Sequence, residues 1–185
     1  MKVAQLLAIA IVAANGLAAQ AGDIQYPKTV YDATYDLKST AGASTMRMVS
    51  NGKGQMRTEN KGASYSMASI TDYPGHVVYT IMDAQKMVMK TPLAQSYKDT
   101  SADSLKTKKG AQDLGVKNIA GHPSHGWKYT ENGTTSEVWI DEKAQIVTRS
   151  NTTSPSGNST MEIKSLSTAA PPDSLFKPPS GYKMQ

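Results

Sequence analysis

The sequence predicts a mainly β protein, a single curved antiparallel sheet that forms a half-open barrel with a short helical or loop lid. Apolar residues recur at every second position through most of the chain, whereas helical periodicity is nearly absent. Turn-forming residues separate these segments closely, which leaves little room for the crossover helices of a parallel sheet. We therefore expect about ten short strands in one antiparallel sheet.

The first half of the chain contains six of the predicted strands. Between residues 31 and 38, Tyr31 and Tyr35 share one face with Ala33 and Leu37, while polar and charged residues take the other face. Further segments with alternation follow at residues 46–48, 55–59, 65–67, 76–81 and 87–89. The last two flank residues 83–86, a typical turn sequence, and are predicted to form a hairpin.

The pattern lapses over residues 92–115, where we expect a short helix or lid with loops. Alternation then returns in a predicted meander whose strands lie at residues 127–129, 137–141, 146–150 and 159–166. The Asn132-Gly133 pair is typical of a tight hairpin turn within it. Near the end, four prolines bracket Leu175 and Phe176, which predicts an extended strap that pins both side chains onto the sheet.

The first 21 residues are predicted to be an export signal, which leaves residues 22–185 as one domain. Lys2 precedes the apolar stretch 6–14, which is too short to span a bilayer. Ala19 and Ala21 then occupy the −3 and −1 positions of a cleavage site. We therefore expect a periplasmic or secreted protein. With no cysteine and no later apolar run of bilayer length, it should be soluble, without a transmembrane segment, lipid anchor or disulfide.

The net charge of +5 is spread thinly along the chain, apart from a cluster at Lys106, Lys108 and Lys109. This cluster fits a solvated loop or a contact with an anionic headgroup or acidic partner. Nucleic-acid binding is not expected, because the chain is predicted to be exported and its basic residues do not alternate with aromatic stacking residues. We expect a monomer.

Three stretches, taken together, resemble a known family. They are LGVKNIAGH at residues 114–122, EVWID at residues 137–141 with Arg149 after it, and PDSLFKPPSGY at residues 172–182. In this order and spacing they resemble secreted domains of unknown function whose fold is similar to that of the periplasmic lipoprotein carriers LolA and LolB. The resemblance implies a half-open β-barrel with an apolar cavity for acyl chains. This chain differs from the carriers in its thin helical region and in lacking an arginine that matches their internal latch.

No catalytic constellation is evident in the sequence. It has neither a G-x-S-x-G motif nor a cysteine, and the adjacent Ser124 and His125 have no identifiable orienting acid. We therefore predict a protein that is not an enzyme and has no cofactor and no assigned catalytic or metal-binding residue.

Methionine is unusually frequent: nine of the ten methionines follow the export signal, against one phenylalanine in the chain. Two pairs at residues 46 and 48 and at residues 87 and 89 place thioethers on one strand face, as a soft Cu(I) ion accepts, and His122 and His125 could add imidazoles. The same spacing suits a pliable core or the wall of a cavity for acyl chains. All three interpretations stay open at this point.

The leading hypothesis is an exported envelope protein that holds an apolar or lipid-like ligand in a half-barrel cavity, without covalent chemistry. The predicted ligand-binding side chains come from four segments in which apolar residues recur at every second position: Tyr31, Tyr35, Met46, Met48, Tyr79, Ile81, Met87 and Met89. We expect all eight on one concave face. The alternatives are a periplasmic copper-binding protein that uses Met and His, and an interaction module that docks an envelope protein.

Overall fold

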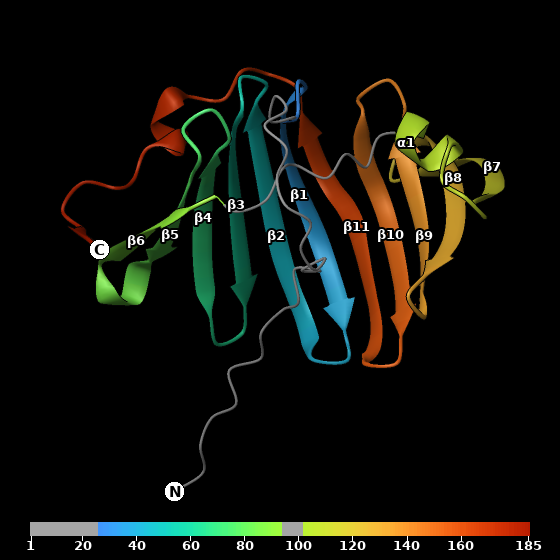
Figure 1. Cartoon of the computed structure of the whole chain (residues 1–185), viewed down its shortest axis with the longest axis horizontal. Coiled ribbons are helices and arrows are strands. Elements are labelled where there is room, and N and C mark those ends of the chain that lie inside the picture. Colours follow the sequence, from blue (N-terminus) through green and yellow to red (C-terminus); the bar gives the residue numbers. More distant parts are fainter. Residues whose placement is uncertain (1–25, 94–101) are drawn as a thin grey trace, which may run out of the picture.

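The structure, a computed structural model, describes residues 26–93 and 102–185 and contains one curved sheet of twelve strands (Figure 1). The strands lie in the order β12-β6-β5-β4-β3-β2-β1-β11-β10-β9-β8-β7. Neighbouring strands run antiparallel, except that β12 is parallel to β6. Because the edge strands β12 and β7 do not pair with each other, the sheet stays open. The predicted mainly β fold with a single curved, unclosed sheet is confirmed.

Two meanders form most of the sheet, and a short last strand extends it. The strands of the first half are β1 (Val30–Ser39), β2 (Gly42–Asn51), β3 (Gln55–Gly62), β4 (Ser66–Asp72), β5 (Val77–Met82) and β6 (Met87–Pro92). Those of the second half are β7 (Gln112–Ile119), β8 (His122–Glu131), β9 (Thr134–Asp141), β10 (Ile146–Ser154), β11 (Gly157–Ser167) and β12 (Lys183–Met184). The short helices are η1 (Asp83–Gln85), α1 (Ala102–Lys106) and η2 (Asp173–Phe176).

Each of the ten segments predicted from alternation overlaps a strand, with Tyr65 and His76 lying just before β4 and β5, and β5 and β6 form the predicted hairpin around η1. The turn between β8 and β9 places Asn132 at φ 50° and Gly133 at φ 74°, the left-handed conformation for which that residue pair is suited. The sequence prediction omitted β7 and β12. In β7 a register shift between Asp113 and Gly115 breaks the alternation, so no period-two pattern was visible there.

The segment 92–115 was predicted to be a short helix or lid with loops. Its described part contains α1, which confirms the short helix, and the first residues of β7, which correct the prediction. Residues 94–101 lie outside the described residues, as does the predicted export signal at residues 1–21. Among the residues that are described, no helix has the length and apolar character needed to cross a bilayer.

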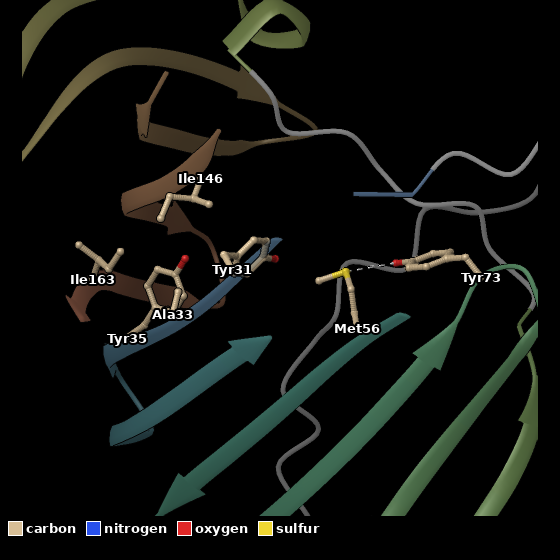
Figure 2. Close-up of a cluster of buried hydrophobic side chains, with 7 residues drawn as sticks. All are labelled: Tyr31, Ala33, Tyr35, Met56, Tyr73, Ile146 and Ile163. Carbon is tan, nitrogen blue, oxygen red and sulfur yellow. Dashed lines mark hydrogen bonds between the residues drawn. The ribbon is translucent and has the colours of Figure 1, made fainter. Parts of the chain in front are cut away.

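The sheet has two different faces, and α1 packs against one of them, which we call the inner face (Figure 1). Ala102 and Leu105 of α1 are buried there against Trp127, Val138 and Ile140. A second buried cluster on this face consists of Tyr31, Ala33, Tyr35, Met56, Tyr73, Ile146 and Ile163 (Figure 2). It is centred on β1 and β11, the pair of strands that joins the two meanders.

The opposite, outer face is covered over β2 to β6 by the C-terminal segment. Phe176 is buried, and Leu175 and Tyr182 pack beside it against a cluster formed by Val49, Ala68, Ile70, Ile81 and Val88. The guanidinium of Arg57 donates to the Leu175 carbonyl at 3.2 Å, and the Tyr182 hydroxyl donates to Asp83 at 3.0 Å. The predicted strap is therefore confirmed, and β12 extends it along the edge of the sheet.

The strap should stabilise the fold mainly through Phe176, which is 4% exposed. Replacing Phe176 with Ala should lower the free energy of unfolding by about 3–5 kcal/mol, because a large buried side chain is lost and a cavity remains. The matched control is Lys177→Ala at the adjacent, exposed position, with an expected change of about 0.5 kcal/mol or less. Urea unfolding of both variants measures this difference. Equal stability of the two variants would show that the strap is not part of the folded core.

Candidate functional site

Cross-strand register gathers the methionines onto the inner face. Tyr35 lies opposite Met46, Met46 opposite Asn60, and Asn60 opposite Met67. Residues directly opposite each other in a sheet project from the same face, and the alternation along each strand extends this assignment. Of the nine methionines in the described chain, eight share the inner face with Tyr35: Met46, Met48, Met56, Met67, Met82, Met87, Met89 and Met161. The ninth, Met184, pairs with Val88 on the outer face.

These methionines lie in two neighbouring rows that cross the sheet from β2 to β6. The first row runs through Met46, Asn60, Met67, Met82 and Met87. The second row runs through Met48, Thr58, Ser69, Thr80 and Met89. The wall is therefore built from thioethers, small hydroxyl side chains and the amide of Asn60, a combination that is uncharged and adaptable in shape.

The inner face of β1 to β6 carries no charge in the described structure, because every charged residue of these strands lies on the outer face. On that outer face Arg47 binds Asp32 through two contacts of 2.9 and 2.6 Å, and Arg57 lies 2.7 Å from Glu59. The hydrogen bond to Asp32 raises the pKa of Arg47. The charges thus pair with one another on the side away from the methionine rows.

The exposed fraction of the inner-face side chains increases from β1 towards β6. At one end Tyr35 is 2% exposed and Met56 8% exposed, and the Tyr73 hydroxyl donates to the Met56 Sδ at 4.0 Å (Figure 2). Burial raises the pKa of the Tyr35 phenol, as expected in a dry environment. At the other end Met67 is 45% and Met89 41% exposed. The face therefore passes from a filled core at β1 to a partly exposed apolar surface at β4 to β6.

Six of the eight predicted site residues share this face: Tyr31, Tyr35, Met46, Met48, Met87 and Met89. The placement of Tyr79 and Ile81 was wrong. Ile81 lies opposite Ala68 and Val88 and is buried beneath the strap, and Tyr79 packs against the same outer cluster. The reason is that the register pairs Met89 with Thr80, so Thr80 is the inner residue of this part of β5. Apolar residues occur on both faces of β5, and its sequence alone did not distinguish them.

The sequence prediction missed four inner-face methionines, namely Met56, Met67, Met82 and Met161. Each lacks a methionine two residues away, so no pair marked it. Their common face emerges only once the strands are aligned in register. A better signal would have come from asking, for every methionine in the predicted hairpins, which face of the sheet the alternation assigns to it.

The two histidines of β8 do not meet. His125 is on the inner face, where its Nε2 lies 2.7 Å from Asp113 and its ring stacks on Trp127 at 4.2 Å. His122 Nδ1 lies 3.2 Å from Asp141, at the end of β9. Backbone hydrogen bonding of Gly115 to Asp113, together with the contact to His125, lowers the pKa of Asp113. The two imidazoles therefore have separate carboxylate partners.

Among the described residues, the predicted methionine pairs do not come together with His122 and His125. The methionine pairs on β2 and β6 are separated from β8 by four or more strands of the sheet. In the part of the chain that the structure describes, no group of three or more His, Asp or Glu residues is arranged to hold a metal ion. Ser124 donates to the His122 carbonyl and accepts from Thr148, so its hydroxyl is not directed at His125.

Solved structures share this open sheet. An uncharacterised conserved protein from Thermus thermophilus superimposes with a TM-score of 0.63 at 11% identity, over 85% of this chain and 90% of that one. A chain from the complex of Pseudomonas aeruginosa MucA and MucB superimposes on this chain with a TM-score of 0.56 at 14% identity. The match covers 80% of this chain and 55% of that one. This chain thus spans about half of that MucA/MucB chain. At these identities the likeness shows the fold alone.

A LolA superfamily protein from Nitrosomonas europaea aligns with 84% of this chain at 12% identity, with a TM-score of 0.39 that is too low to support an argument. No curated protein matches the sequence. The fold defines a domain built on a single open antiparallel sheet. More particularly, residues 31–150 match the family model of a domain of unknown function, DUF4412, and the chain belongs to that family. The predicted resemblance to a family of domains of unknown function is thereby confirmed.

Proposed function

We propose that this protein is an exported binding protein of the cell envelope, whose inner face holds an apolar or lipid-like ligand without covalent chemistry. The observation that carries this proposal is the uncharged, methionine-rich inner face of β1 to β6, which becomes exposed at Met67 and Met89. An exposed apolar surface of this kind is typical of a binding site.

The chemistry of the wall suits an acyl chain. Each methylene group transferred from water to such a surface contributes about 0.8 kcal/mol, so a long chain can offset the free-energy cost of association. Methionine side chains adapt to chains of different shape, and the hydroxyls of Thr58, Ser69 and Thr80 provide hydrogen-bonding groups for an ester or other uncharged head. The absence of a cation on the inner face of these described strands favours a neutral ligand over a free carboxylate.

A partner protein of the envelope is the second candidate. Its support is the edge strand β7, which pairs only with β8 among the described strands and exposes 68% of Val116. An edge strand of this kind can accept a further strand from another chain. The matched structure of MucB in complex with MucA shows that a protein with this fold assembles with a partner.

Export itself is part of the proposal and rests on the sequence of residues 1–21. Cleavage after Ala21 should give a mature protein that begins at Gly22. The intact mass of the protein recovered from the periplasm or culture medium measures this directly. Replacing Ala19 and Ala21 with bulky residues should leave the precursor uncleaved. A mature exported protein that still contains residues 1–21 would contradict this part of the proposal.

Binding of the apolar ligand can be measured by titration with a fluorescent fatty acid methyl ester. We expect saturable binding by the wild type at tens of micromolar or below, which corresponds to about −6 kcal/mol. Met48→Trp should weaken it roughly tenfold or more, because the larger ring occupies space on the inner face. Met184→Trp is the matched control, since it makes the same exchange on the outer face. Absence of binding by a folded wild type, or equal loss in both variants, would contradict an inner-face site.

A further inference from the structure

Three methionines lie side by side at the exposed end of the first row. Met82 of β5 is directly opposite Met87 of β6, and the pairing of Ala68 with Ile81 places Met67 of β4 opposite Met82. Opposed residues on adjacent strands have Cβ atoms about 5 Å apart. Each methionine has three rotatable bonds beyond Cα, so the three sulfur atoms can converge on one point above the sheet.

Packing does not account for thioethers at this place. Met67 is 45% exposed, and the neighbouring Met89, two residues beyond Met87, is 41% exposed. Methionine is favoured where it fills irregular interior space, and a surface position gains nothing from that property. Of the eight inner-face methionines, Met56 belongs to the buried core and Met46, Met48 and Met161 pack against it, whereas Met67, Met82 and Met87 belong to none of the buried clusters of the described residues. Met67, Met82 and Met87 thus place three thioethers at opposed positions of three adjacent strands.

A group of three neutral thioethers selects a particular class of ion. Soft sulfur ligands bind Cu(I) in preference to hard divalent cations, which need carboxylate or carbonyl oxygens. The inner face of the described strands β1 to β6 offers no carboxylate, so Mg²⁺ and Ca²⁺ find no suitable ligands there. Lys183, opposite Met87 on β12, is exposed and can extend its ammonium group into water, but its charge also disfavours an ion of higher valence.

We propose that Met67, Met82 and Met87 form a binding site for a soft monovalent ion, Cu(I) or its analogue Ag(I), coordinated by sulfur alone. This inference goes beyond the proposed apolar-ligand function and does not depend on it. It also differs from the copper alternative that the sequence suggested, because no histidine takes part and the pairs at residues 46/48 and 87/89 are not the ligand set. The site uses one methionine from each of three strands.

The test titrates the whole mature chain with Ag(I) in chloride-free buffer, and with Cu(I) under anaerobic conditions against a chromogenic Cu(I) chelator. We expect one equivalent to bind. The triple variant Met67→Leu, Met82→Leu, Met87→Leu keeps the apolar surface but removes the sulfur atoms, and it should lose affinity by roughly a hundredfold or more. The matched control Met56→Leu, Met161→Leu, Met184→Leu also removes three thioethers and should stay within about threefold of the wild type. X-ray absorption of the Cu(I) form should show sulfur ligands only.

The inference is overturned if the folded wild type binds neither ion, or if the first triple variant binds them as well as the control does. Titration of the same variants with the fluorescent ester separates the two proposals. Leucine preserves the apolar area, so ester binding should persist in the first triple variant even though ion binding is lost. If the wild type binds Ag(I) but does not bind the ester, only the apolar-ligand proposal is contradicted.

Discussion

The pairing of β1 with β11 is the constraint on which the rest of the sheet depends. It is the ladder that joins the meander of residues 30–92 to the meander of residues 112–167. Because side chains alternate with a period of two, this register determines which residues of each strand, in both meanders, lie on the inner face and which on the outer face. The buried cluster around Tyr35 and Ile163 fixes it, since a slip by one residue would move Tyr35 to the charged face. The collection of methionines on one face is a consequence of that register.

The two faces of the sheet differ in their charge and in the segments that cover them. On the outer face, paired charges such as Arg47 with Asp32 surround a cluster that the C-terminal strap covers through Phe176. On the inner face, α1 covers Trp127 and Val138 at one side of the sheet, while Met67 and Met89 stay exposed on the other side. Three buried clusters therefore stabilise the fold, one centred on β1 and β11, one beneath the strap and one beneath α1. The exposed part of the inner face remains available for binding.

The sequence predicted the strands well because alternation and turn chemistry are local properties. The turn at Asn132 and the strap residue Phe176 are examples, since each carries its own conformational or hydrophobic preference. Where both faces of a strand are apolar, the local sequence does not show which residues lie on which face of the sheet. Ile81 was placed with the methionines, although its burial is produced by a strap about a hundred residues later in the chain. Single methionines such as Met67 and Met82 gave no signal until the register aligned them.

The central claim is that the inner methionine face, and not another surface, receives the ligand. The most direct test is a methyl NMR spectrum of protein labelled at the methionine ε-carbon, recorded during titration with a long-chain acyl ester. The account predicts saturable shifts of the inner-face methyl groups at Met48, Met67 and Met89, with the outer-face Met184 unchanged as an internal reference. Shifts confined to Met184, or no shift at any methionine under conditions where the ester binds, would contradict it.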